Sequence, residues 1–227
     1  MPAKVAIIAA LPREINGLVR GMSPDAALLR RGIHLYQANG AVVVAAGMGE
    51  ERAAIAVEAA LAASTANVLI SIGLAGACTP HLSAGDMTEA TLVIDAKTGE
   101  RFATDSTADH PCVLVTTEAI ASIQEKARLA ASYEASLVDM EASTVARLAR
   151  AHGLGFRAIK AISDAHDFEF ASLARFAGKH GTFRTGAFAL YTALRPHHWT
   201  KTARLGRDSN RALSKLHAVL RDVIATD

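Results

Sequence analysis

The sequence has little of what supports disulfides, metal sites or a nucleic-acid surface. Its only cysteines, Cys78 and Cys112, form no CxxC pair, and its nine histidines show no HExxH pattern. A disulfide framework and a histidine- or cysteine-ligated metal are therefore not expected, and a reducing cytoplasm is the default location. The formal net charge is only +2, which supplies no broad basic surface for a nucleic acid.

Long apolar runs are also missing. No stretch approaches the roughly 20 residues that a transmembrane helix needs, so no transmembrane segment is expected. The run from Val5 to Leu11 is barely long enough for a signal-peptide core, and it ends in Pro-Arg-Glu rather than in a small-residue cleavage site. A buried first strand is the better interpretation.

Two common catalytic motifs are absent as well. No GxSxG nucleophile elbow occurs, and neither cysteine stands in a pattern with histidine that suggests a nucleophile. In GMGEERAAIA, residues 47–56, the third glycine of a dinucleotide fingerprint is replaced by Arg52, and Glu50 and Glu51 would repel a pyrophosphate. These residues argue against a nucleotide-dependent dehydrogenase. The turn is either a plain tight turn or a ligand contact.

The sequence does have a regular alternation of buried strands and helices. Its 227 residues are 51% hydrophobic, which is enough for one sizeable core. Helical patterns cover residues 12–20, 50–64, 118–132 and 141–152. Strand-like runs fall at residues 5–10, 67–73, 85–95, 112–117, 135–140 and 156–163, and Asn39-Gly40 predicts a hairpin within 33–49.

No internal repeat or linker divides the chain, so residues 1–227 are predicted to form a single α/β domain. Its expected core is a mixed, mostly parallel central sheet flanked by helices. From about residue 168 the chain is predicted to continue as a helical C-terminal extension, broken around Pro196. Open parallel sheets bind ligands beyond the carboxyl ends of their strands. Five short segments follow predicted strands there: ALPRE, GMGEE, GLAGAC, VDME and SDAHD.

Four acidic residues lie near these strand ends, and three of them are open to more than one interpretation. Glu141 stands where a strand meets a helix, as a cap of that helix or as an acceptor for a ligand's paired hydroxyls. Asp139 lies on the same face of the strand without a defined task. Asp164 either caps the next turn or protonates a leaving group as a partly buried acid. Glu14 is an ordinary first-turn acid or a base that faces the same crevice.

SIGLAGAC, residues 71–78, brings small residues to a further strand end. Gly73, Ala75 and Gly76 would let a flat ligand lie against the backbone. The alternative is a crowded crossover with no room for side chains.

Together these segments resemble the purine nucleoside phosphorylase and nucleosidase superfamily. VDMEASTVARLARAHGLGFRAIKAISD (138–164) is similar to the family pattern of valine, acidic residue, Met-Glu, helix, strand and Ser-Asp, in order and spacing. KVAIIAALPREI (4–15) and SIGLAGACTPHLSAGDM (71–87) are similar to its opening strand and its glycine turn. The chain resembles methylthioadenosine/S-adenosylhomocysteine nucleosidases and, through 95–105 and 204–213, more closely the hopanoid-associated phosphorylases.

The resemblance implies cleavage of the bond between ribose C1′ and a purine nitrogen of an adenosine-type nucleoside. The transition state would be oxocarbenium-like, as in glycoside hydrolysis. By match, Glu141 accepts hydrogen bonds from the ribose 2′ and 3′ hydroxyls, Asp164 protonates N7 of the base, and Glu14 holds and deprotonates the attacking water. Supporting roles fall to Ser163, which orients Asp164, to Met140 against the sugar, and to Ala75, Gly76 and Met48 as pocket walls. The resemblance also implies a homo-oligomer, with no cofactor and phosphate as a candidate co-substrate.

Some positions depart from the family pattern. The nucleosidases carry a serine where Leu74 stands, and the phosphorylases commonly carry an arginine at the position of Ser71. Lys160 replaces an arginine that is usual three residues before the Ser-Asp. A phosphate site would be poor, although Arg13 or Lys160 could add charge, so water and phosphate both stay open as the nucleophile. Leu74 also leaves room for an alternative, a non-catalytic nucleoside-binding module with the same fold.

No residue of the matched segments is assigned to stack on the base or to contact the 5′ substituent. No phenylalanine occurs near 118–120, where the nucleosidases carry one, so Phe168 or Phe170 is expected to stack on the base. In the hopanoid-type branch the nucleoside would be lipid-linked. Apolar residues of the tail could then cover its hydrocarbon, although core or interface packing is the simpler interpretation; these residues are Phe183, Phe188, Tyr191 and Leu194.

Overall fold

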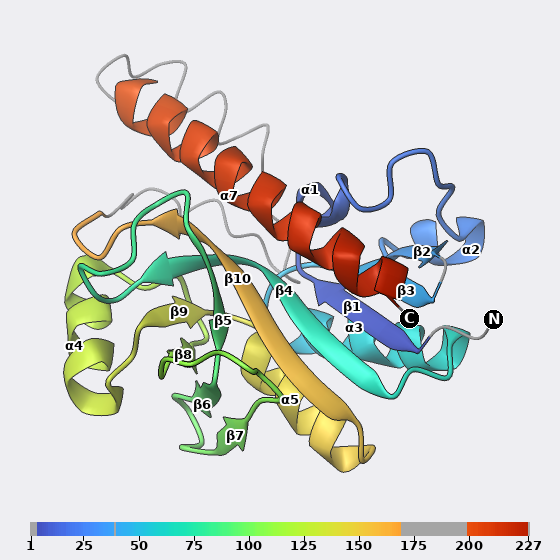
Figure 1. Cartoon of the computed structure of the whole chain (residues 1–227), viewed down its shortest axis with the longest axis horizontal. Coiled ribbons are helices and arrows are strands. Elements are labelled where there is room, and N and C mark those ends of the chain that lie inside the picture. Colours follow the sequence, from blue (N-terminus) through green and yellow to red (C-terminus); the bar gives the residue numbers. More distant parts are fainter. Residues whose placement is uncertain (1–3, 39, 169–198, 227) are drawn as a thin grey trace.

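The computed structural model describes residues 4–38, 40–168 and 199–226, and a ten-stranded mixed sheet lies at its centre (Figure 1). The strands are β1 (Val5–Ala9), β2 (His34–Ala38), β3 (Ala41–Ala45), β4 (Val68–Ala77), β5 (Met87–Ala90), β6 (Leu92–Asp95), β7 (Arg101–Ala103), β8 (Val113–Thr116), β9 (Leu137–Asp139) and β10 (Gly155–Asp164). The helices are α1 (Pro12–Ile15), α2 (Ala26–Leu29), α3 (Glu50–Ala63), α4 (Ile123–Tyr133), α5 (Ala142–Ala151) and α7 (Trp199–Thr226). This is the α/β fold class that the sequence predicts.

The sheet is built around β4. This strand pairs in parallel with β1 and with β10, and its last residues pair antiparallel with β9. The main path runs β2-β3-β1-β4-β9-β8-β6-β7, while β10 lies between β4 and β5. β1 and β3 are buried at every residue, as expected of aliphatic strands that are covered on both faces. The parallel pairing brings the ends of β1, β4 and β10 to the same edge of the sheet.

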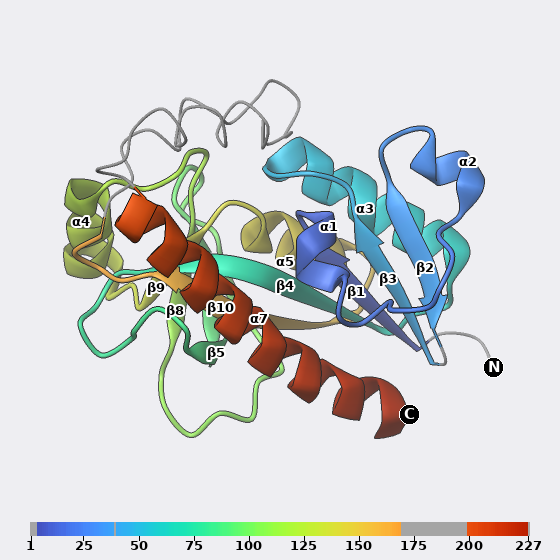
Figure 2. The same cartoon turned by 90° about the horizontal axis from the view of Figure 1, so that it is seen from above.

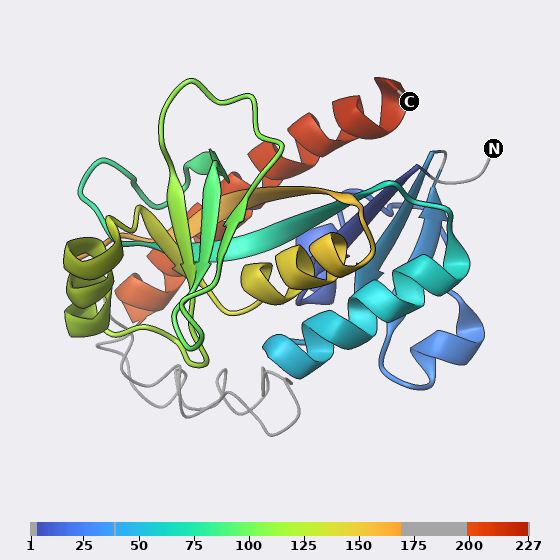
Figure 3. The ribbon, with the colours of Figure 1, turned by 90° about the horizontal axis from the view of Figure 1, so that it is seen from below.

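Helices cover both faces of the sheet. α3 and α5 pack on one face, where small residues such as Ala56 and Ala146 let them lie close to the strands (Figure 3). α7 crosses the opposite face, burying Leu213, Leu216 and Leu220 against β1, β4 and β10 (Figure 2). Leu129 of α4 joins a smaller cluster with residues of β6, β8 and β9. Among the helices that the structure describes, none has both the length and the apolarity to cross a bilayer.

Several predicted elements form as expected. The hairpin of β2 and β3 pairs Ala38 with Ala41, and Gly40 in its turn has a φ of 73°. α3 and α5 occupy the predicted helical segments, and Gly153 follows α5 with a φ of 66°, where glycine is favoured.

Other boundaries differ from the prediction for local reasons. The helix predicted over 12–20 ends at Ile15, and a Cβ on Gly17 would lie 2.1 Å from the His217 ring of α7. The segment 85–95 forms two strands, β5 and β6, and a further strand that was not predicted, β7, pairs antiparallel with β6. α4 begins only at Ile123, because the Ser122 side chain caps it.

The predicted C-terminal extension is only partly covered. The break around Pro196 and the helical pieces before it lie outside the described residues, whereas α7 runs without a break from Trp199 to Thr226.

Candidate active site

The candidate site lies where β1, β4, β9 and β10 end. Contacts join segments that are far apart in the chain: Glu14 bonds to Leu74, and Glu141 bonds to Gly49. Asp164 lies beside Gly76 of β4. The side chains of Glu14 and Asp164 lie against β4, and that of Glu141 reaches Gly49 just after β3. Because β3, β1, β4 and β10 run in parallel, the three acids lie at the same edge of the sheet, although β9 itself runs antiparallel to β4.

Glu14 is buried and held by backbone amides. Its Oε2 accepts hydrogen bonds from the amides of Ala10 (3.1 Å) and Leu11 (2.8 Å), and its Oε1 accepts one from the amide of Leu74 (3.1 Å). Two of these contacts fold the carboxylate back onto the start of α1, as a first-turn acid does. The third places it against β4, so the two interpretations of Glu14 are compatible.

Gly73 makes this approach of Glu14 sterically accessible. A Cβ at position 73 would lie 3.0 Å from Glu14 Oε1, and the residue has a φ of 131°, which side chains rarely tolerate. The departure at Leu74 has little effect on the contact, because the amide of Leu74 and not its side chain bonds to Glu14. The motif SIGLAGAC thus lets the carboxylate of Glu14 lie close to the backbone of β4.

Glu141 does not cap α5 with its side chain. It occupies the N-cap position without a side-chain cap bond, and its Oε1 instead accepts a hydrogen bond from the amide of Gly49 (2.8 Å). The residue as a whole is half-buried, and protein atoms surround its carboxyl group so that burial is the main influence on its pKa. Burial raises its pKa to about 8; the neighbouring charges of Asp139 and Glu14 act in the same direction, while Lys160 and the Gly49 amide oppose them. An enclosed carboxyl group with a raised pKa is typical of a functional site, where a ligand supplies the missing hydrogen-bond donors.

Asp139 takes the structural role that Glu141 lacks. Its Oδ2 accepts a hydrogen bond from the amide of Ala142 at the start of α5 (3.0 Å), and Thr116 Oγ1 donates to its Oδ1 (2.7 Å). Lys160 Nζ lies 2.8 Å from Oδ2, and both side chains of this ion pair are almost fully buried. Asp139 is therefore a helix cap and the partner of a buried lysine.

Lys160 is fully engaged inside the protein. Its ammonium contacts Asp139 and donates to Ser71 Oγ (2.9 Å). Ser71 stands where the phosphorylases carry an arginine, and it is buried too. Arg13, the other candidate for charge near a phosphate, is exposed.

Asp164 lies at the end of β10, and each of its two carboxylate oxygens has a side-chain partner. Ser163 Oγ lies within hydrogen-bond distance of Asp164 Oδ1 and 3.2 Å from the carbonyl of Ala75. Lys126 Nζ of α4 donates to Oδ2. Sequence reasoning missed Lys126, because a lysine within an amphipathic helix normally extends into solvent.

The remaining predicted wall residues differ in exposure. Ala75 has its side chain in the hydrophobic core, and its carbonyl is the part that reaches Ser163. Met48 and Met140 are half-buried, as is Phe168. Phe170 and the apolar tail residues 183, 188, 191 and 194 lie outside the described residues.

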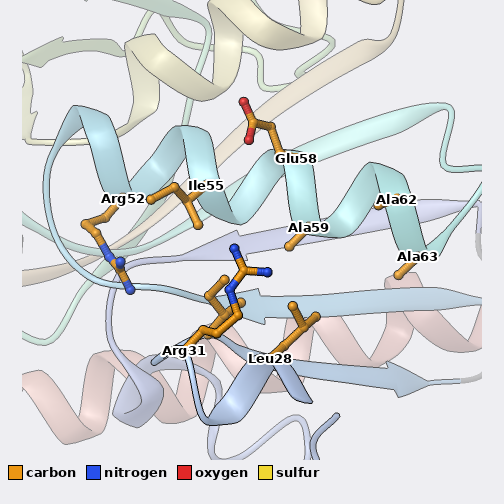
Figure 4. A pocket seen from close by; sticks show the side chains of 9 residues that line it. Leu28, Arg31, Arg52, Ile55, Glu58, Ala59, Ala62 and Ala63 are labelled. Carbon is orange, nitrogen blue, oxygen red and sulfur yellow. The ribbon is translucent and has the colours of Figure 1, made fainter. Parts of the chain in front are cut away.

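A separate groove of about 440 Å³ lies between α2 and α3 (Figure 4). It is lined by Leu28, Arg31, Ile33, Arg52, Ile55, Glu58, Ala59, Ala62 and Ala63. Arg52 donates to the carbonyl of Gly32 (3.2 Å) across it. None of the residues predicted for catalysis lines this groove, so it is not the candidate active site.

Cysteines and metal ligands form no further centre in the described part of the chain. Cys78 and Cys112 are buried and unpaired, and burial raises the pKa of the Cys78 thiol to about 12. The described histidine, cysteine and acidic side chains form no group of three that could hold a metal ion.

Comparison with solved structures identifies the fold. The 5′-methylthioadenosine/S-adenosylhomocysteine nucleosidase of Helicobacter pylori superposes with a TM-score of 0.68 at 14% identity, covering 98% of this chain and 99% of that one. The H. pylori futalosine hydrolase gives a TM-score of 0.60 at 16% identity over 70% of this chain and 89% of that chain. The 5′-methylthioadenosine/S-adenosylhomocysteine nucleosidase of Neisseria meningitidis, in complex with methylthio-immucillin-A, gives a TM-score of 0.59 at 22% identity, covering 71% of this chain and 86% of that chain.

Sequence comparison identifies the family. No curated protein sequence matches the chain. The family model described as the phosphorylase superfamily, however, matches residues 4–111 and 110–194, which together span most of the sequence. The chain belongs to the phosphorylase superfamily.

Proposed function

We propose that the protein is an enzyme that cleaves the N-ribosidic bond of an adenosine-type purine nucleoside. The observation that carries this proposal is the meeting of Glu14, Glu141 and Asp164 at one edge of the sheet, each in a different environment. Glu14 is bound by amides, Glu141 is enclosed with a raised pKa, and Asp164 is held between a hydroxyl and an ammonium. Breaking a glycosidic bond requires acid and base groups with such distinct environments.

Each group has a defined task in this proposal. Glu141 accepts hydrogen bonds from the ribose 2′ and 3′ hydroxyls, and Met140 packs on the sugar. Asp164, oriented by Ser163, protonates N7, so that the base leaves as a neutral molecule. Glu14 holds the attacking water and removes its proton as the oxocarbenium-like sugar forms.

The contacts inside the protein favour water over phosphate as the nucleophile. A phosphate needs donors and positive charge near Gly73, but Ser71 and Lys160 are bound to each other and Lys160 also to Asp139. The carboxylate of Glu14, close behind Gly73, would repel an anion. The amide of Leu74 still holds Glu14 beside β4 although the serine is replaced, which supports an enzyme over a non-catalytic binding module.

The 5′ substituent and the assembly stay predictions from the resemblance, and the location stays a prediction from the cysteine content. Residues 95–105 and 204–213 favour the hopanoid-associated branch, and thus a lipid-linked adenosine as the substrate. The protein is expected to be a cytoplasmic homo-oligomer that needs no cofactor. Comparing 5′-methylthioadenosine with an adenosine that carries a long 5′ hydrocarbon would test the branch: a lipid-type enzyme has the higher kcat/KM on the second compound.

The experiment that tests the proposal is a base-release assay with 5′-methylthioadenosine, adenosine and inosine, each with and without phosphate. We expect release of adenine from at least one adenosine-type compound at a rate that phosphate does not change. A strict requirement for phosphate would overturn the choice of water. Absence of release from every compound under both conditions would overturn the enzymatic assignment for these substrates.

A further inference from the structure

Lys126 is a lysine in an unusual place. It lies in α4, yet its side chain is only 2% exposed, whereas its helix neighbour Arg128 is exposed. Lysine is almost never fully buried unless it is paired, because its ammonium loses hydration. The burial of Lys126 therefore calls for specific partners.

The ammonium of Lys126 uses all its donors within the protein. Nζ donates to Asp164 Oδ2, to the carbonyl of Ala165 (2.8 Å) and to the carbonyl of Phe168 (3.1 Å). An ammonium has three N–H groups, so these contacts leave none for a substrate. Lys126 can act on a bound nucleoside only through the groups it holds.

Asp164 is the anionic partner of this ammonium. Glu125, the acidic neighbour of Lys126 in α4, is bound to the exposed Arg128. Cys78 lies near the pair, but burial raises the pKa of its thiol to about 12, so the thiol is neutral at physiological pH. Among these groups, the negative charge that balances Lys126 is that of Asp164.

Gly76 of β4 leaves the space that the pair needs. A Cβ at position 76 would lie 3.0 Å from Asp164 Oδ2 and 3.1 Å from Lys126 Cε. A larger residue would push against both partners at once. The glycine that sequence analysis places in the pocket wall thus accommodates an ion pair between α4 and β10.

We propose that Lys126 is a positioning residue for departure of the base, acting through its ionic hydrogen bond to Asp164; this inference rests on the proposed function. Asp164 takes a proton from solvent and gives it to N7 of the purine. Its O–H bond breaks as the N7–H bond forms, and the electron pair of the C1′–N bond goes to the base. The carboxylate that remains is stabilised by the Lys126 ammonium, which also fixes its direction.

The test compares Lys126→Met with wild type on two substrates. An adenosine-type nucleoside needs a proton on its leaving base, whereas 4-nitrophenyl β-D-ribofuranoside has a leaving group that departs without one. General acid catalysis contributes about 10²- to 10⁴-fold, so we expect Lys126→Met to lower kcat on the nucleoside by about 10²-fold and to change the nitrophenyl reaction by less than about threefold. Equal losses on both substrates, or no loss on either, would overturn the proposal.

Two further variants serve as controls. Arg128→Met removes a cation from the exposed face of the same helix and should leave both reactions unchanged. The double variant Lys126→Met/Asp164→Asn contains no unpaired buried charge, so it remains informative if the single variant folds poorly. Because Lys126 acts through Asp164, the double variant should match Asp164→Asn on the nucleoside within about threefold. A further tenfold loss would show an independent role and contradict the proposal.

Failure of the proposed function is distinguishable from failure of this inference. If wild type cleaves neither compound, the enzymatic assignment fails, and adenine binding by calorimetry then tests Lys126. In that case Lys126→Met should weaken adenine binding as much as Asp164→Asn does, with Arg128→Met unchanged. Adenine affinity that is insensitive to Lys126→Met would overturn the positioning role.

Discussion

At the scale of single residues, the side chain that caps α5 is that of Asp139, for which local reasoning has no task, and not that of Glu141, for which a cap is one of two interpretations. Glu141, at the N-cap position, bonds across the site to Gly49, while Asp139 accepts the amide of Ala142 and caps α5. The sequence shows an acid at a helix start in both cases. Which carboxylate turns inward depends on Lys160, 21 positions beyond Asp139 in the chain, and that contact becomes known only once the fold is known.

The raised pKa of Glu141 predicts a pH dependence of nucleoside binding. Ribose hydroxyls donate to the ionised carboxylate, and in the free protein this form is fully populated only above a pH of about 8. The affinity of the Asp164→Asn variant, in which we expect cleavage to be at least about 10²-fold slower, should therefore increase for adenosine as the pH rises from 6 to 9. Calorimetric titration measures this directly. Adding Glu141→Gln should weaken binding and flatten the profile, and an affinity that falls with rising pH would contradict the assignment.

The same group predicts the direction of a stability change. The folded pKa of about 8 lies above the unfolded value of about 4.3, so between these values the folded protein binds more protons than the unfolded chain. The free energy of unfolding should then fall as the pH rises through this window. Compared with wild type, Glu141→Gln should lose less stability between pH 5 and 8.5 in urea unfolding. An equal loss in both proteins would contradict the raised pKa.

Gly73 allows a prediction about the position of Glu14. Gly73→Ala adds a Cβ at 3.0 Å from Glu14 Oε1 and strains a backbone with a φ of 131°. We expect a loss of about 1–3 kcal/mol in stability and a fall in kcat, because the carboxylate is displaced. Gly99→Ala is the matched control: Gly99 has a φ of 75° but nothing within 4 Å of the added Cβ. This control should lose stability alone, and an unchanged kcat in Gly73→Ala would contradict the role of Gly73.

At the scale of elements, the buried strands and the longer helices were predictable and the short elements were not. β1, β3 and α3 follow from continuous aliphatic or alanine-rich runs, whose burial decides their structure. α1 is shorter than its pattern suggests: it ends at Ile15, and Gly17 beyond it lies against His217 of α7. β7 escaped prediction because three residues carry too little pattern, and its hairpin depends on Asp95 bonding the turn amides of Lys97 and Thr98.

The ion pair of Asp139 and Lys160 joins the β9–α5 segment to β10. Removing only the lysine should lower the stability more than removing both charges. Lys160→Met leaves a buried carboxylate without its cation and should lower stability by about 3–5 kcal/mol. The double variant Asp139→Asn/Lys160→Met removes both charges and should recover part of that loss. Urea unfolding of both variants checks this. A double variant that is less stable than Lys160→Met would show that the pair contributes by something other than mutual neutralisation.

At the scale of the whole molecule, the site depends on parts of the chain that are far apart in sequence. The superfamily and the place of the three acids at strand ends could be inferred from motifs, because the spacing of each motif is local; the catalytic roles of the acids stay predictions. Lys126 could not, since its partner Asp164 is 38 positions away and no local signal distinguishes it from a solvated lysine. The C-terminal helix also reaches the site: His217 Nε2 lies 2.7 Å from the carbonyl of Glu14, so α7 supports the segment that carries the proposed base.

The rate of adenine release from 5′-methylthioadenosine and adenosine in phosphate-free buffer tests the central claim most directly. We expect release by wild type, and a loss of about 10²-fold or more in Asp164→Asn, with that variant still folded by circular dichroism. Wild type that releases no adenine from either nucleoside, or Asp164→Asn that releases it at the wild-type rate, would show that the three acids do not form an N-ribosidic cleavage site.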